Sequence, residues 1–416
     1  MVRSKGSMFL DKAVVFLLYC MAILPFAQVF HMNIGFAIIN AVELLLLSLC
    51  FVFIIIIINR GIATQHLLYV FLVIAIFVFY SSYSLVFLDV SFSSWVNQTR
   101  HFLPFLVACM ALLTRLYIDI VKFLNGITFV IAISAVWAII MHLFFQDFIA
   151  YAFAANNEVV RIIIEGGRMY WGSSALAMFG LTALMIERDS SKRKLLGFAV
   201  IVVLVGSVFT QSRTMLGGLL VFYVFAQLFV FKKRVRPVIY ISVIALIVAA
   251  SFLLLASDNM IELLQSRLFL TDSAGAEIER AFTVGKVGNY IQYLDILRST
   301  LPLGQGLGLP FSYGMVSGEP IYISDISLVS FSIPFGVLGL GMLLMFIYRL
   351  LKSFQRYATI YCNATIPRVF YWLLVSAFLI SLNVDVFSRN IFVVFLAVFA
   401  VIHFVPSDQT TQQVRK

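Results

Sequence analysis

Charged residues are scarce in this chain. Of its 416 residues, 12% are Asp, Glu, Lys or Arg, while 62% are hydrophobic. A soluble domain of ordinary composition carries roughly 25% charged residues. Apolar runs of roughly 20 residues, the length that the hydrocarbon layer of a membrane requires, recur along the sequence. The composition therefore excludes an ordinary soluble protein and predicts an integral membrane protein.

Cysteine and histidine are scarce as well, at four and five residues. The cysteines lie in or beside apolar runs, without CxxC spacing and without nearby histidine pairs; they are Cys20, Cys50, Cys109 and Cys362. This pattern indicates neither a disulfide framework nor a zinc site, and we interpret the cysteines as packing residues. The carboxylates are not clustered as the ligands of a hard cation would be, so we predict no metal site and no cofactor.

The apolar runs predict an all-α membrane bundle of about twelve transmembrane helices. It forms a single transmembrane domain over residues 1–416, without a soluble domain or a repeat of fixed period. The seventh and eighth runs are short, but together they are too long for one crossing, and basic residues flank the pair. We expect them to form a helical hairpin with residues 210–214 at its tip. The expected spans are 13–30, 36–58, 67–88, 101–114, 123–145, 170–186, 195–209, 215–231, 237–256, 326–348, 368–384 and 390–405.

The basic residues orient this bundle. A net charge of +10 would suggest a nucleic-acid partner in a soluble protein, but in a membrane protein the charge must first be divided by side. With both chain ends in the cytoplasm, most of the 29 Lys and Arg residues lie inside, as the positive-inside bias requires. We therefore expect no nucleic-acid partner. The basic residues expected outside are Arg100, Arg161, Arg168, Arg213, Arg267, Arg280, Lys286, Arg298 and Arg389.

Two outer segments are longer than a connection between helices requires. Residues 146–169 form the third outer loop, and residues 257–325 form a large fifth loop between the ninth and tenth helices. Within the fifth loop, residues 277–300 have a helical composition. We expect them to form an amphipathic helix that lies against the membrane face.

The outer basic residues are almost all arginines, whose guanidinium group binds phosphate oxygens through two parallel hydrogen bonds. Arg213 stands at the hairpin tip beside Gln211 and Ser212, where an ionisable residue is a functional candidate by default. Arg168 follows two glycines, which would allow the backbone to approach a ligand closely. The alternative is that these arginines pair with outer carboxylates.

Three further features carry weaker signals. Asp325 lies where the fifth loop meets the tenth helix, so it is either a general base or a carboxylate that stabilises a helix N-terminus. The glycine run at 304–308 resembles a nucleotide-binding loop only superficially, because no strand precedes it and no helix directly follows. We interpret it as a flexible turn that returns the loop to the membrane. Glu43, inside the second span, is expected to be a paired packing residue.

These features resemble the O-antigen polymerase and ligase superfamily of bacterial envelopes, and in particular its Wzy-type polymerases. The resemblance covers the topology of nearly the whole chain. It consists of the twelve helices, the long third and fifth outer loops, the hairpin tip at 210–214, and the segment 301–308 followed by Asp325 and a helix start at 336–341.

The loops of these polymerases carry a pattern of an arginine, ten residues and a glycine. Arg161 and Gly172 match this pattern in the third loop. In the fifth loop no arginine matches it, since Arg298 and Gly308 are one residue too close. The second half of the pattern is therefore missing from this chain.

The ligase branch typically carries a histidine in its long outer loop. Residues 257–325 contain none, and the outer histidines that we identify, His31 and His101, lie at span ends. This difference favours a polymerase over a ligase. A cation near the corresponding position is expected in both branches, and Arg280 or Lys286 would supply it.

The resemblance implies a glycosyltransferase of lipopolysaccharide biosynthesis in the bacterial inner membrane, with its site facing the periplasm. It would transfer glycan from an undecaprenyl pyrophosphate-linked donor to the terminal sugar of a lipid-linked acceptor. Its partners would be undecaprenyl pyrophosphate-linked oligosaccharide, membrane lipid and, as a candidate, a chain-length regulator protein. Asp325 would act as the base, and the donor pyrophosphate would be bound by Arg168, Arg213, Arg161, Gln211, Ser212 and one of Arg280, Lys286 or Arg298.

Two alternatives stay open. The first is a ligase that transfers glycan to the lipid A-core. The second is a flippase for lipid-linked oligosaccharide, which would be expected to show related halves and charges along the membrane interior. Here the charges gather at one outer face beside a long loop, which favours the enzyme.

Overall fold

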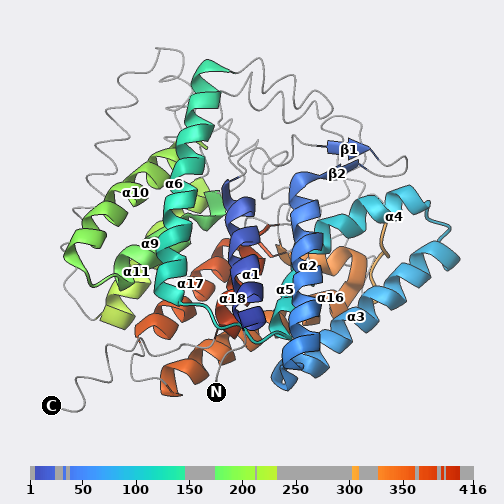
Figure 1. Ribbon diagram of the computed structural model, residues 1–416. Helices are drawn as coiled ribbons and strands as arrows, with labels where there is room; N and C mark the ends of the chain where they lie inside the picture. The colour runs from blue at the N-terminus through green and yellow to red at the C-terminus, as the bar shows by residue number, and fades with distance from the viewer. Residues whose placement is uncertain are drawn as a thin grey trace.

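The computed structural model shows a bundle of α-helices with one short β-hairpin (Figure 1). All structural statements below concern the part of the chain that it describes. That part consists of residues 5–23, 31–33, 38–145, 174–210, 213–231, 302–308, 327–360, 365–381, 386–387 and 390–402.

The first half of the bundle begins with helix α1 and includes α6, which Asp119 caps by accepting from the amides of Val121 and Lys122. The helix α2 ends at Gly61, whose φ of 75° suits a helix C-terminus. The elements are α1 (Lys5–Ile23), α2 (Ala41–Arg60), η1 (Thr64–His66), α3 (Leu67–Ser82) with its π-helical continuation η2 (Tyr83–Phe87), α4 (Phe92–Thr99), η3 (Arg100–Phe102), α5 (Leu103–Leu112) and α6 (Ile120–Phe144).

The second half of the bundle also contains a helix that an aspartate caps. Asp189 caps α10 by accepting from the amides of Ser191 and Lys192. The elements are η4 (Ser174–Leu176), α9 (Ala177–Ile186), α10 (Ser190–Phe209), α11 (Arg213–Phe225) with its continuation η5 (Ala226–Phe231), α16 (Ser327–Ile360), α17 (Thr365–Ser381) and α18 (Phe392–Val401).

Several of these helices can cross a membrane. Within the described ranges, four are long and apolar enough: Ala41–Arg60, Thr64–Phe87, Ile120–Phe144 and Ser327–Thr359. Large apolar side chains on α2 and α3 face outward, including Ile58 at 77% exposure and Leu68 at 76%, as expected of a surface that contacts lipid. The prediction of a helical membrane protein is confirmed. The twelve spans and the large outer loop stay predictions.

Polar contacts identify the two ends of the bundle. The Nη1 atom of Arg60, where α2 ends, lies 2.8 Å from Oδ1 of Asp11 on α1. The same nitrogen donates to the backbone carbonyl of Arg115, just before α6 begins. We call this the Arg60 end, and we call the opposite end, where α2 begins, the Glu43 end. In Figure 1 the Glu43 end is at the top.

The core of the bundle surrounds α18. All ten residues of this helix are buried, and it packs against α5 and α16. Phe399 of α18 is the centre of an aromatic cluster, with its ring 4.5 Å from that of Phe370, 5.1 Å from that of Phe179 and 5.2 Å from that of Phe123. A helix that is apolar on every side is expected to be enclosed in this way.

Several of the expected spans begin or end elsewhere; for example, α1 begins at Lys5 and not at 13. Residues Ile38–Asn40, expected within the second helix, form strand β2, which pairs antiparallel with β1 (His31–Asn33). An apolar run suits either structure, and here strand pairing satisfies the backbone groups. The tenth span was expected to end at 348, but α16 continues to Ile360. The part of α16 after residue 348 carries charged residues that bind Gln65. Arg349 donates to the backbone carbonyl oxygen of Gln65, and Arg356 donates to its side-chain oxygen.

Candidate functional site

Residues 302–308 form a glycine-rich turn that docks at a break in α16. The break is at Gly336, whose φ of 60° and ψ of −141° are not helical. Backbone amides of the turn, those of Gln305 and Gly306, donate to carbonyls of α16 at 2.7 and 3.1 Å. In return, the amide of Val337 donates to the carbonyl of Pro302 at 3.1 Å. The turn and the broken helix thus satisfy one another's backbone groups.

Side chains of α3, η2 and α4 hold the other side of the turn. The Ser84 hydroxyl accepts from the amide of Leu307 at 2.6 Å, and the side-chain oxygen of Gln98 accepts from the amide of Gly308. The Tyr80 hydroxyl donates to a backbone carbonyl of the turn. Leu307 is fully buried. The turn does return the chain to the bundle, but the interpretation as a flexible turn was wrong, because residues 306–308 are buried and the turn is hydrogen-bonded on both sides.

Glycine is required within this turn. Gly304 has a φ of 81°, a conformation that other residues rarely adopt. A Cβ atom there would lie 2.4 Å from the backbone nitrogen of Gly336 and 2.7 Å from the carbonyl oxygen of Pro334. The close approach of two backbones therefore explains the glycine run, and no phosphate is needed to account for it.

Most of the predicted site residues lie outside the described residues. These are Arg161, Arg168, Gln211, Ser212, Arg280, Lys286, Arg298 and Asp325. Arg213 is the first residue of α11.

The points at which the chain enters and leaves these segments can be located. The helix α6 starts at the Arg60 end and, with 25 residues, is about 37 Å long, so Phe144 lies at the Glu43 end. The end of α10 reaches the same region, because the ring of Phe209 lies 6.4 Å from that of His142 on α6. The glycine-rich turn and the first half of α16 lie on that side as well. In Figure 1 the C-terminal end of α6 is at the top of the bundle.

An ion pair at the Glu43 end accounts for one outer arginine. The Nε atom of Arg100 lies 3.9 Å from Oε1 of Glu43, in the first turn of α2. The Glu43 side chain is 13% exposed and that of Arg100 is 32% exposed. Glu43 is therefore a paired packing residue, as expected. Arg100 pairs with a carboxylate, which is the alternative to phosphate binding that we gave for the outer arginines.

His142 is a candidate that the sequence analysis missed. It lies in the last turns of α6 and is 1% exposed. Neither ring nitrogen has a hydrogen-bond partner among the described residues. A buried polar group of this kind normally has one, so the imidazole requires an explanation. The sequence did offer one signal for this residue. His142 is near the end of the expected span 123–145, and this end is on the same predicted side of the membrane as the hairpin tip at 210–214.

No protein-family model matches the chain, and the curated proteins compared with it gave no match. Among the described residues, no group of three or more His, Cys, Asp or Glu side chains could hold a metal ion. The chemistry that these residues offer at the Glu43 end is hydrogen bonding, from Ser84 and Gln98, and proton transfer by the imidazole of His142.

Proposed function

We propose that the chain is a bacterial inner-membrane glycosyltransferase that polymerises lipid-linked glycan repeat units. The donor is a glycan on undecaprenyl pyrophosphate, and the acceptor is the terminal sugar of a second lipid-linked unit. The reaction takes place at the Glu43 end, which faces the periplasm if the positive-inside bias holds.

The best support for the proposal is the position of the candidate residues in the sequence, next to elements that lie at the Glu43 end. Arg213 begins α11 at the Glu43 end, Arg298 precedes the docked turn by four residues, and Asp325 precedes α16 by two. Because an extended chain covers at most about 3.6 Å per residue, we expect these groups to lie near that end. Cations and a carboxylate in one neighbourhood are what a pyrophosphate-linked donor and a hydroxyl acceptor require.

In the proposed reaction, the oxygen of the acceptor hydroxyl attacks the anomeric carbon of the donor. The bond between that carbon and the pyrophosphate oxygen breaks, and its electron pair leaves with the pyrophosphate. Arg168 and Arg213 stabilise the negative charge that develops on the leaving group. Asp325 accepts the proton from the acceptor hydroxyl.

Purified protein in detergent, supplied with radiolabelled lipid-linked repeat units, tests the proposal. We expect the glycan chain to grow without a sealed membrane. A flippase cannot give this result, because it transports its substrate between compartments. Transfer to the lipid A-core without any growth of the carrier-linked chain would show a ligase instead.

The envelope polysaccharide of a deletion strain is an independent test. Loss of a polymerase leaves a single repeat unit on the lipid core. Loss of a ligase leaves none there, while polymer still accumulates on the carrier. We expect the first result.

A further inference from the structure

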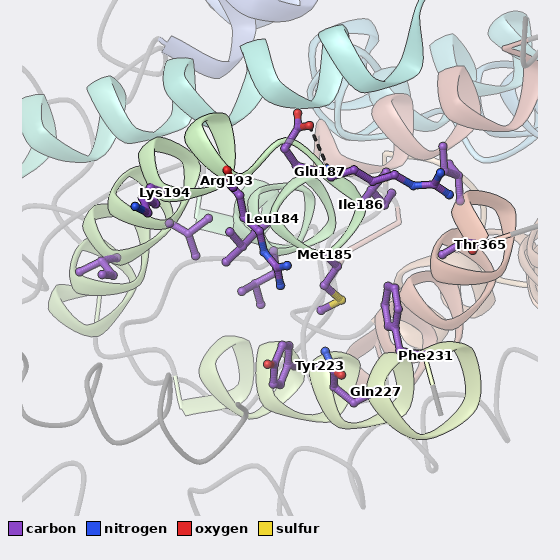
Figure 2. Close-up of a pocket in the computed structure, with 17 residues that line it drawn as sticks. Leu184, Met185, Ile186, Glu187, Arg193, Lys194, Tyr223, Gln227, Phe231 and Thr365 are labelled. Atoms are coloured by element: carbon purple, nitrogen blue, oxygen red, sulfur yellow. Dashed lines mark hydrogen bonds between the residues drawn. The ribbon is translucent and has the colours of Figure 1, made fainter. Parts of the chain in front are cut away.

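A cavity of about 980 Å³ lies between α9, α10, α11 with η5, and α17 (Figure 2). It is at the Arg60 end, because Glu187 on its rim accepts a hydrogen bond from Asn125, near the start of α6. Its walls are largely apolar, and they include Leu181, Leu184, Met185, Val200 and Ile201. It is therefore separate from the proposed glycan site at the Glu43 end.

The rim of this cavity is basic. Arg188, Arg193 and Lys194 line it, and all three are exposed. Figure 2 shows Arg193 extending from α10 toward the space between α10 and α11. Arg193 and Lys194 have no carboxylate partner among the described residues, whereas the adjacent Lys192 lies 3.9 Å from Asp189.

One carboxylate, Glu187, also lines the cavity. Its Oε2 atom accepts from the side chain of Asn125, and its Oε1 atom accepts from the backbone amides of Arg188 and Asp189 at 3.0 and 3.1 Å. Arg193 and Lys194 thus present positive charge at the rim that no carboxylate among the described residues pairs.

A tyrosine also lines the cavity. Tyr223 of α11 is 7% exposed. Figure 2 shows its ring directed from α11 toward α10, beside Gln227. Because a tyrosine hydroxyl can donate a hydrogen bond, the cavity offers a hydroxyl donor in addition to the cations Arg193 and Lys194.

We infer that this cavity binds the phosphate headgroup and upper acyl chain of an anionic phospholipid. Guanidinium and ammonium groups at the rim form charge-assisted hydrogen bonds to the phosphodiester oxygens. The apolar walls accept the acyl chain, and basic pockets between membrane helices commonly hold such headgroups. A zwitterionic lipid would bring its own cation toward Arg193 and Lys194, so phosphatidylglycerol is preferred over phosphatidylcholine. This inference does not depend on the proposed function.

Native mass spectrometry of the full-length protein tests it with phosphatidylglycerol and phosphatidylcholine that carry the same acyl chains. We expect the protein to retain phosphatidylglycerol preferentially. Because each 1.4 kcal/mol of lost interaction is a factor of ten in affinity, the double variant Arg193→Ala with Lys194→Ala should bind it roughly tenfold more weakly or worse. Lys192→Ala is the matched control on the same turn of α10, and it should bind like the parent protein.

A variant that narrows the cavity and a competition with inorganic phosphate test the inference further. Gly197→Leu narrows the cavity without removing a charge, because a Cβ at Gly197 meets only Leu184, at 3.9 Å. This variant should bind phosphatidylglycerol more weakly while the thermal midpoint stays at or above that of the parent. Inorganic phosphate at matched concentration should not compete. Equal retention of both lipids, unchanged binding by the double variant, or displacement by inorganic phosphate would each overturn the inference.

Discussion

The hydroxyl oxygen of Tyr80 lies 3.1 Å from the backbone carbonyl oxygen of Phe335. The same hydroxyl also donates to the carbonyl of Leu303 in the glycine-rich turn. One side chain of α3 therefore reaches both the break in α16 and the turn that docks against it. The rings of Tyr80 and Phe335 also meet edge to face, with centroids 5.3 Å apart. This contact connects α3 to residues 302–308, in the last third of the predicted outer loop.

Tyr80→Phe should destabilise the protein by about 1–2 kcal/mol, because it leaves buried carbonyl groups without their donor. Thermal unfolding of the purified protein in detergent measures the loss. The matched control is Tyr83→Phe, one turn later, which keeps the ring that stacks on Phe79. Equal thermal midpoints for the two variants would show that the Tyr80 hydroxyl contributes no stability.

Gly304→Ala should destabilise the protein by at least about 1 kcal/mol, because an alanine at positive φ is strained and its Cβ would collide with the backbone at Gly336. Gly217→Ala is the control, since nothing lies within 4 Å of a Cβ there and α11 is helical around it. That variant should be neutral or gain up to about 1 kcal/mol. The pair is compared by thermal unfolding under one set of conditions. A neutral Gly304→Ala would contradict the close docking of the turn.

Arg168→Ala and Arg213→Ala should each severely reduce polymer formation while protein abundance stays near normal. Losing a donor that stabilises charge in the transition state costs about 2.7 to 4 kcal/mol, a hundredfold or more in rate. Lysine at either position should retain some activity, because it keeps the charge and loses the bidentate geometry. The measurement is polymer length distribution on gels, normalised to membrane-inserted protein.

The controls for this series are Arg267→Ala and Arg389→Ala. We assign both arginines to surface ion pairs, which contribute roughly 0 to 1 kcal/mol, so both variants should be close to silent. Full-length polymer from both Arg168→Ala and Arg213→Ala would exclude the proposed pyrophosphate site.

His142→Leu should raise the thermal midpoint and lower polymer formation. Removing a buried imidazole that has no partner relieves a desolvation cost of about 1–3 kcal/mol. A gain in stability with a loss of activity is the behaviour of a residue retained for function. Thermal unfolding and the gel assay are run on the same preparation. If the variant is more stable and makes normal polymer, His142 has no part in the reaction.

The sequence predicted the helical membrane architecture well, because long apolar runs can only be satisfied in a bilayer. It also predicted the pairing of Glu43. It could not show which helices are central. Both α3 and α18 are apolar on all sides, yet Leu68 of α3 is 76% exposed while α18 is wholly buried. Lipid and protein interior are equally apolar, so periodicity does not distinguish them.

The site was harder to predict for a different reason. The glycine run was recognisable as a turn, but its role depends on partners far away in the sequence, such as Ser84 and Gln98. The helix start expected at 336–341 is instead a break inside α16, which begins at Ser327. Gly336 is needed there because the carbonyl of Pro302 would lie 2.1 Å from a Cβ at that position. Such long-range backbone contacts leave no local pattern in the sequence.

The enclosed position of α18 has a consequence for biogenesis. A helix of ten residues is about 15 Å long, half of the hydrocarbon layer, so it has little capacity to insert into a bilayer independently. It follows α5, α16 and α17 in the chain and is therefore synthesised after them. The bundle can reach its final packing only after α18 has been made, and removal of α18 would take away its centre rather than its edge.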